Sequence, residues 1–591
     1  MRRALQRLVD RWRAGLPPAD RWLDGGIPWA AVLLAPVLPF LLSGPIRAVT
    51  SLSLSVALAL AVLVCATAAR AVWPWLRTRR DAWRRRAAWM PEAAVLLPVG
   101  FAVWALYIRA FDGFPNLDGW DGGTHVVIKD VFATLAPSIY TRQVAYYGFA
   151  WWLERLFGLD AFRSFTIAFY VTVTLAVAFP FAVALAVVHR GAAASRPALA
   201  AGTVATVLGA VGALWLVILP LLHYNQAAGF YVHVFGLIPL VLLWAADVLI
   251  RLPLLRLVAL LGGLAFLRYA YALNLADAAL AVACGLLVEG FRGRWRLVQR
   301  LAAVGLVVAA WRVVVELRPV FHVWGGMQRF DVDRLLVADL LAIGGSALYL
   351  LVDSWQWPPR AWQHRPLPRA LRFPLVFALA SSALVSVLRR GQGVLQYYVT
   401  KYQMWACILL AFVLVILLAH GAVVMAKAGS WRRPRLWLHA VLLAGLLATV
   451  PPLWRKTFAG YQQTLDERMV ARGPTYPHLH ALADVEALAR IKAILAVQHK
   501  QFGGYLTNFF PRFSFMNATL GRHTGYQEFF PPAIAPGYCV FWVTRERDLE
   551  PLGPVDRLEA HRLAVAAPGS SCVEYAVPWK ATPQSLCHRC F

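Results

Sequence analysis

Long hydrophobic stretches recur along this chain from Ile27 to Trp454 and constrain its fold more than any other feature. Each has about 18 or more residues, enough to cross a hydrocarbon layer of roughly 30 Å as a helix. The stretches are apolar on all faces, whereas a soluble helix carries one apolar stripe. We therefore predict an all-α polytopic membrane protein with about thirteen transmembrane helices. The predicted spans are 27–46, 51–75, 92–109, 164–188, 198–222, 230–250, 253–270, 272–291, 301–320, 335–353, 373–388, 403–425 and 436–454.

The basic residues are grouped in the loops between these stretches. Counted over alternate loops, one side of the predicted membrane carries 28 Lys and Arg and the other carries 11. Because cytoplasmic loops are rich in Lys and Arg, we predict a bacterial inner (plasma) membrane protein with a cytoplasmic N-terminus and an extracytoplasmic C-terminal segment. The short basic clusters do not form the continuous basic face that nucleic acid needs. The expected partner of these loops is the lipid bilayer, with no nucleic acid.

Two segments depart from the pattern of spans and short loops. The first is a large periplasmic loop at 109–163, within a transmembrane module at 1–454. It contains an aromatic stretch that we expect along the outer membrane surface. The second is 455–591, which returns to a soluble composition with a helical pattern followed by short strand-like runs. We predict that this segment is a small α/β domain on the periplasmic side.

The final segment holds four of the seven cysteines, namely Cys539, Cys572, Cys587 and Cys590. In an exported domain they would form two disulfides, in any of three pairings. Cys587-His-Arg-Cys590 is alternatively half of a metal site. Because the chain has no second C-x-x-C, the disulfides are favoured.

Carboxylates cluster beside glycines at the start of the first large loop. Asp118 and Asp121 directly follow a predicted span, and Asp121 precedes Gly-Gly-Thr-His at the head of a predicted helix. Such carboxylates act as general bases or as ligands of a hard divalent cation, so the cofactor stays open between a divalent cation and none. The alternative is that Asp-Gly pairs simply form turns. His125 is a candidate substrate ligand or a structural histidine.

Cations on the non-cytoplasmic side oppose the general charge bias. The pair Arg389 and Arg390, followed by Lys401, is the richest group, and Arg268 is a further candidate. A lipid-linked phosphate would explain their position, whereas ordinary snorkelling at helix ends is the alternative. Polar and aromatic residues suited to sugars are His223, Tyr397, Tyr505 and His523.

Three segments carry a family resemblance. They are D-G-G-T-H-V-V-I-K-D at 121–130, Y-Y-G-F-A-W-W-L-E-R-L-F-G at 146–158 and V-L-R-R-G-Q-G-V-L-Q-Y-Y at 387–398. With the early acidic loop, the many spans and the soluble tail, they resemble the GT-C glycosyltransferases, and most closely the arabinofuranosyltransferases that prime arabinan on mycobacterial galactan. The chain differs from the frequent family form in having Gly122 where many members place a second acid.

The resemblance implies a transferase that moves a sugar from a polyprenyl-phosphate donor to a glycan, lipid or protein acceptor of the cell envelope. Asp121 would be the catalytic base, with Asp118 as the second candidate, and the outward cations would hold the donor phosphate. Three rivals stay open. They are a lipid-linked glycan transporter or flippase, an O-antigen ligase or polymerase, and a non-catalytic assembly protein. The early position of the large outward loop and the absence of an internal repeat favour the transferase.

Overall fold

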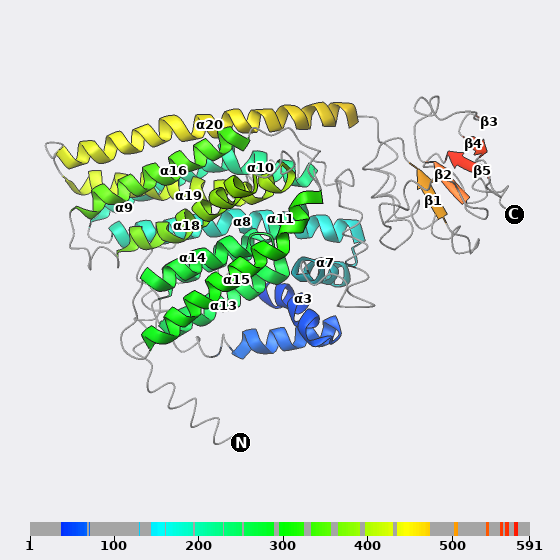
Figure 1. The fold of residues 1–591 in the computed structure, drawn as a ribbon, viewed down its shortest axis with the longest axis horizontal. Coiled ribbons are helices and arrows are strands. Elements are labelled where there is room, and N and C mark those ends of the chain that lie inside the picture. Colours follow the sequence, from blue (N-terminus) through cyan, green and yellow to red (C-terminus); the bar gives the residue numbers. More distant parts are fainter. Residues whose placement is uncertain are drawn as a thin grey trace, which may run out of the picture.

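A computed structural model provides the fold (Figure 1). It describes residues 37–67, 70, 129, 144–159, 161–192, 195–227, 230–250, 253–288, 295–323, 332–355, 365–389, 396–428 and 434–472, and the strand segments 502–505, 539–542, 556–559, 562–566 and 573–576.

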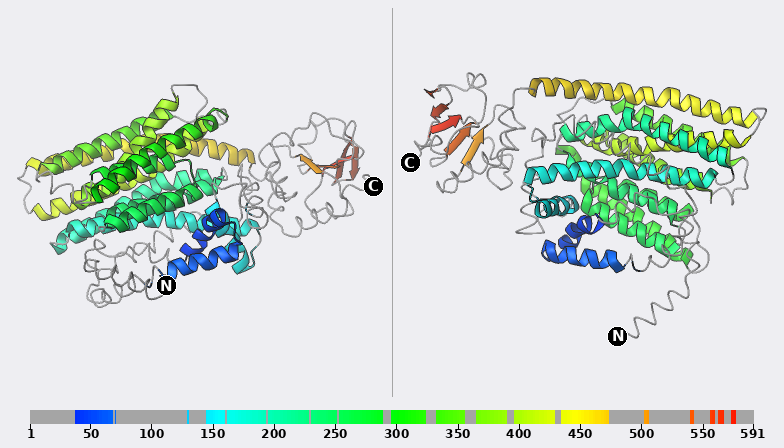
Figure 2. Two further views of the ribbon diagram at one scale, coloured as in Figure 1. Left: turned by 60° about the horizontal axis from the view of Figure 1, so that its bottom comes forward. Right: turned by 180° about the vertical axis from the view of Figure 1, so that it is seen from behind.

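Long helices dominate these ranges and run side by side (Figures 1 and 2). Within the described residues, eight helices are long and apolar enough to cross a membrane, or nine if one bent pair counts as a single span. This confirms a multi-pass, all-α membrane architecture. The eight are Ile167–Arg190, Arg196–Leu222, Tyr231–Leu249, Leu297–Val315, Asp333–Ser354, Pro366–Ser386, Lys401–Lys427 and Leu436–Phe458.

Those spans lie in longer helices, and two of them are composite. One runs through α9 (Arg196–Ala213), a π-helical turn (Leu214–Ile218) and α10 (Leu219–Ala227), and another joins α11 (Tyr231–Phe235) to α12 (Leu237–Leu249). A π-turn widens a helix locally and is frequent beside functional sites. The other helices are α8 (Ala161–Ala192), α13 (Pro253–Ala270), α14 (Leu275–Val288), α15 (Trp295–Val323), α16 (Val332–Ser354), α18 (Pro366–Arg389), α19 (Gln396–Ala428) and α20 (Pro434–Arg472).

The first two predicted spans differ from the structure. Helix α3 (Leu38–Thr50) and the helix Leu54–Thr67 meet at a bend of 118°. Ser51 makes the bend with a left-handed backbone (φ 57°), and Arg47 donates to the Leu52 carbonyl at 2.7 Å across it. The sequence predicted two complete spans, 27–46 and 51–75, with a break between them. The break is present, but the two described helices pass as a span only when they are taken together.

Two later helices differ in length from their predicted spans. Helix α14 has 14 residues, where the sequence predicted a span over 272–291. At about 1.5 Å per residue it is shorter than the hydrocarbon layer. Helix α20 continues to Arg472, well past the predicted end at Trp454. Its last part is polar, so hydropathy alone did not reveal that it is helical.

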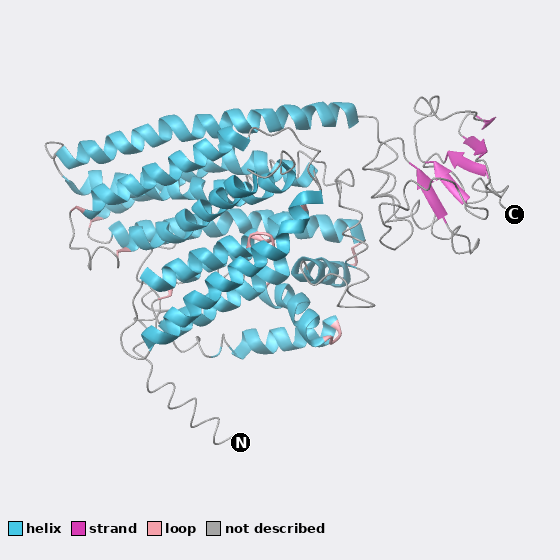
Figure 3. Cartoon of the chain, viewed as in Figure 1, coloured by secondary structure: helices cyan, strands magenta, loops and turns pink. Residues whose placement is uncertain are grey.

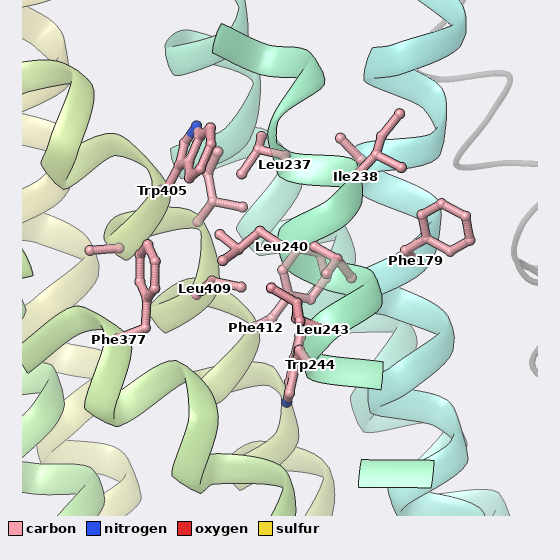
Figure 4. Close-up of a cluster of buried hydrophobic side chains, with 14 of the residues drawn as sticks. Phe179, Leu237, Ile238, Leu240, Leu243, Trp244, Phe377, Trp405, Leu409 and Phe412 are labelled. Atoms are coloured by element: carbon pink, nitrogen blue, oxygen red, sulfur yellow. The ribbon is translucent and has the colours of Figure 1, made fainter. Parts of the chain in front are cut away.

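Helix α19 lies at the centre of the core, because every residue from Lys401 to Leu417 is buried. A helix that is apolar on all faces needs such a position. Figure 4 shows its neighbours: side chains of α8, α12 and α18 interdigitate with it, and Trp405 and Trp244 lie at opposite ends of the cluster. The labelled residues are Phe179, Leu237, Ile238, Leu240, Leu243, Trp244, Phe377, Trp405, Leu409 and Phe412.

Helix α7 (Val144–Phe157) crosses the bundle instead of following it, and is seen nearly end-on in Figure 1. It packs on α3 where two glycines meet: a Cβ on Gly44 would lie 2.1 Å from the Val144 carbonyl oxygen. Tyr146 and Tyr147 of α7 are fully buried. The sequence predicted this helix, but its tyrosines face the protein core and not the lipid interface.

The strands lie in the C-terminal part of the described residues (Figure 3). They are β1 (Phe502–Tyr505), β2 (Cys539–Trp542), β3 (Asp556–Glu559), β4 (Arg562–Ala566) and β5 (Val573–Ala576), in the sheet order β1-β2-β5-β4-β3. The pairs β1–β2 and β2–β5 are parallel, and the other two are antiparallel.

Candidate functional site

Polar side chains gather at one end of the bundle, where α10, α13 and α18 end and α11, α14 and α19 begin. We call this the His233 end. The residues that define it are Asn225, His233, Arg268, Tyr271, Lys401 and Trp405. All except Arg268 are buried. Buried polar groups inside a membrane bundle are costly unless they are satisfied, so a cluster of them indicates a structural or functional requirement.

His233 joins α10, α11 and α19. Its Nδ1 lies 3.0 Å from Oδ1 of Asn225, and its Nε2 lies 3.1 Å from the carbonyl oxygen of Lys401. The ring stacks on Trp405 at a centroid distance of 5.1 Å and an angle of 12°, and Tyr271 packs at 4.8 Å. These contacts fix the first turns of α19 relative to α10.

Lys401 is a buried cation at this end. Its Nζ lies 3.7 Å from the centroid of the Phe230 ring. An aromatic face attracts an ammonium group through its quadrupole without neutralising it. Lys401 was one of the predicted phosphate ligands, and the structure places it beside the His233 network.

The start of α14 is held to the rest of the bundle by hydrogen bonds. Ser381 of α18 donates to Oδ2 of Asp277 at 2.9 Å, and the Tyr402 carbonyl lies 3.5 Å from Nδ2 of Asn274. Asp277 is almost fully buried. These contacts connect α14, α18 and α19, so Asp277 acts as a structural joint between them.

A pocket of about 270 Å³ lies between α13, α14 and α15. Its lining is apolar except for Arg268 and Tyr269. Arg268 is exposed, and the described residues give it no ion-pair partner. An apolar pocket with a single guanidinium group matches a lipid that carries one phosphate. The remaining lining residues are Leu264, Ala265, Leu275, Ala279, Leu306, Ala309, Ala310 and Val313.

The acidic loop motif is connected to α7 through its penultimate residue. Lys129 lies eight positions after Asp121 in the sequence. Its side chain is fully buried and forms an ion pair with Glu154 of α7. Helix α7 is in turn fixed by Tyr146, whose hydroxyl donates to the Phe165 carbonyl at 2.6 Å. Burial raises the pKa of the Tyr146 phenol, so this donor stays neutral.

The other predicted site residues are described in part or not at all. Arg389 is the last residue of α18, and Tyr397 is the second residue of α19. His223 lies in α10. Tyr505 is the last residue of β1. The side chains of these four lie outside the described part, as do Asp118, Asp121, His125, Arg390 and His523 and three of the tail cysteines. Their roles stay predictions.

The sequence interpretation did not single out two polar residues inside the spans. One is His233, and the other is Asp339 of α16, which accepts from Trp454 Nε1 at 3.0 Å and from the Cys407 thiol. The available signal was a single polar residue within an apolar run.

At the opposite end of the bundle, arginines gather around Asp247 of α12. Arg256 and Arg372 form ion pairs with its carboxylate, and Arg369 donates to the carbonyls of Asp247 and Ile250. Arg190 donates to the Val248 carbonyl. Guanidinium groups thus cap the C-terminus of α12, where the helix dipole is negative. This cluster is a structural ion network.

Within the described ranges, no group of three or more His, Cys, Asp or Glu has a geometry that would hold a metal ion. No protein-family model, curated protein or solved structure matches the chain in the comparisons. The described residues define an all-helical, multi-pass membrane protein with buried polar residues around His233 and an apolar pocket of about 270 Å³ that Arg268 helps to line.

Proposed function

We propose that the chain is a membrane glycosyltransferase of the GT-C type, which transfers a sugar from a polyprenyl-phosphate donor to a cell-envelope glycan, lipid or protein. The observation that carries the proposal is Arg268 in the lining of the apolar pocket between α13, α14 and α15. A lipid phosphate needs a guanidinium or ammonium group beside a surface for its hydrocarbon chain. The pocket supplies both.

The finer architecture belongs to the same proposal. It comprises about thirteen spans, with the cytoplasmic side at the Asp247 end and the small α/β domain outside. The Lys and Arg bias of the loops supports this orientation. The His233 end, with Arg268 and Lys401, would then face the periplasm, where polyprenyl-phosphate donors are used.

The proposed reaction is a single displacement. Asp121 takes the proton of an acceptor hydroxyl, and that oxygen bonds to the anomeric carbon. The bond between the anomeric carbon and the phosphate oxygen breaks, and polyprenyl phosphate leaves with the bonding electrons. Arg268, Lys401, Arg389 and Arg390, the four predicted phosphate ligands, would stabilise the charge that develops on the leaving phosphate. The ion pair of Lys129 with Glu154 supports a fixed position for the end of the acidic motif.

The test is a transfer assay in proteoliposomes with a panel of polyprenyl-phosphate sugars. Transfer from one donor is expected, with a loss of about 10²-fold or more in Asp121→Asn. Arg268→Ala should mainly raise the donor KM, by about 10- to 150-fold, because a hydrogen bond to a charged group contributes about 1.5–3 kcal/mol. Arg312→Ala on the exposed face of α15 is the matched control. Folded protein that transfers no sugar from any donor would refute the proposal.

A lipid-linked glycan transporter is the second candidate. It is favoured by two carboxyl groups inside the bundle, those of Asp277 and Asp339, since intramembrane carboxyls often mark transport pathways. Transbilayer movement of a fluorescent lipid-linked glycan, measured in the same proteoliposomes, separates the candidates. Movement that is lost in Asp339→Asn, without sugar transfer, would establish the transporter.

A further inference from the structure

Asp277 is a buried carboxylate without a cationic partner in the described part of the chain. It is the third residue of α14 and is 1% exposed. Its hydrogen-bonding contacts are the hydroxyl of Ser381 at 2.9 Å and Nδ2 of Asn274 at 3.4 Å, and both groups are neutral. A carboxylate inside a membrane bundle is costly unless a proton or a cation neutralises it. The contacts of Asn274 distinguish these two possibilities.

Asn274 lies in the break between α13 and α14 and is fully buried. Its Nδ2 is 3.4 Å from Oδ2 of Asp277 and 3.5 Å from the carbonyl oxygen of Tyr402. Both distances exceed the roughly 2.7–3.2 Å of an ordinary N–H···O hydrogen bond. Its Oδ1 has no hydrogen-bond donor among the described residues. Neither end of this amide is therefore well satisfied, in a place where an unsatisfied polar atom is costly.

The two ends of an amide have the same shape, so the surrounding groups decide which end points where. Turned over, Asn274 would place Oδ1 toward Oδ2 of Asp277 and the carbonyl oxygen of Tyr402. Three oxygens would then converge, and only a cation between them makes that arrangement favourable. The observed separations of 3.4 and 3.5 Å fit such a site. Two oxygens at right angles around an ion, each about 2.4 Å from it, lie about 3.4 Å apart.

A proton on Asp277 would neutralise the charge without satisfying Asn274. With the amide as it stands, Oδ1 would still have no donor. With the amide turned over, the 3.4 Å between Asp277 and Asn274 would be too long for an O–H···O hydrogen bond, which measures about 2.5–3.0 Å. A cation contacts both oxygens together. Because the site supplies a single carboxylate, one positive charge balances it, whereas Ca²⁺ sites commonly use several carboxylates.

We propose that the start of α14 binds one Na⁺ ion through the carboxylate of Asp277, the amide oxygen of Asn274 and the carbonyl oxygen of Tyr402. Ser381 donates to the carboxylate and orients it. The three ligands come from α14, the break before it and α19, so the ion joins a short helix to the central one. Unwound backbone beside a broken helix is a recurrent source of Na⁺ ligands in membrane proteins. This site goes beyond the proposed function and does not depend on it.

Thermal unfolding of the full chain in detergent tests the site, in NaCl, KCl and choline chloride at equal ionic strength. An ion that binds only the folded chain stabilises it, so the wild-type melting temperature should be about 2 °C or more higher in NaCl than in the other two salts. Asp277→Asn should lose this difference. The matched control is Asp339→Asn, which removes another buried carboxyl and should keep the difference.

Asn274→Ala is the second variant, because it keeps the carboxylate and removes the amide oxygen. The NaCl concentration that gives half of the stabilisation should rise by about tenfold or more. Farnesyl phosphate, a short substitute for the lipid donor, should bind Asp277→Asn as it binds the wild type, which separates this site from the donor site. Equal melting temperatures of the folded wild type in all three salts would overturn the proposal and leave the donor site intact. An undiminished sodium effect in Asn274→Ala would overturn it as well.

Discussion

The ammonium group of Lys401 lies 3.7 Å from the centre of the Phe230 ring, at the end of the bundle where α19 begins. The two residues come from segments 171 positions apart, and their contact closes the junction between α10, α11 and α19. An aromatic ring attracts an ammonium group through its quadrupole, so this contact helps to hold the Lys401 side chain in place.

Replacing Phe230 tests this contact. Phe230→Leu should weaken farnesyl phosphate binding by about 2- to 30-fold, because a cation–π contact contributes about 0.5–2 kcal/mol. Phe230→Trp should keep the wild-type affinity, since the indole face attracts cations best. Equal binding by the leucine and tryptophan variants would show that the ring only fills space.

Substitution of Gly236 tests the packing at the same junction. A Cβ at this position would lie 2.4 Å from the Trp405 ring and 2.7 Å from Cβ of Tyr271. Gly236→Ala should lower stability by about 1–3 kcal/mol, as other overpacked core sites do. The control is Gly262→Ala in α13, where a Cβ would meet nothing within 4 Å. Thermal unfolding in detergent should separate the two, and equal melting temperatures would contradict this packing.

The ion pair of Lys129 and Glu154 should connect the acidic loop to α7 energetically. Glu154→Gln leaves a fully buried ammonium facing a neutral amide, and we expect a cost of about 1.5–3 kcal/mol. Lys129→Met with Glu154→Gln should cost less than the sum of the single variants. A double-mutant cycle on thermal unfolding measures this coupling, and additive effects would argue against the pair.

Asp247 should be the most sensitive carboxylate at the opposite end. Asp247→Asn leaves Arg256 and Arg372 without a countercharge at this position, and the expected cost is about 3–5 kcal/mol. The matched control is Asp333→Asn at the exposed start of α16, which should cost less than about 0.5 kcal/mol. Expression and monodispersity in detergent report the difference. A well-folded Asp247→Asn protein would show that the arginines tolerate its loss.

The membrane helices could be predicted because hydrophobicity alone decides which segments enter a bilayer. The eight confirmed spans coincide with stretches that the sequence marked, and α7 was expected from its aromatic pattern. A break between the first two predicted spans was expected, but its angle of 118° was not, since that angle depends on the left-handed backbone of Ser51 and the local hydrogen bond from Arg47 to the Leu52 carbonyl.

The candidate site was only partly predictable. Lys401 and Arg268 were found because cations are unusual on the side with few basic residues. The partners that position Lys401 were not found, because His233 and Trp405 come from apolar runs in which each residue looks like ordinary core. Which residues meet across helices depends on packing angles, and these are not written in local sequence patterns.

Helix α20 continues without a break from the predicted membrane span into a polar extension. At about 1.5 Å per residue, the 14 residues from Phe458 to Arg472 measure about 21 Å beyond the end of its apolar part. Whatever follows Arg472 therefore starts at a set height and at a set rotation about the helix axis. Removing one residue would turn that attachment point by about 100°, whereas removing a full turn would lower it and nearly keep its direction. The length of α20 thus sets where Arg472 lies and which way it points from the bundle.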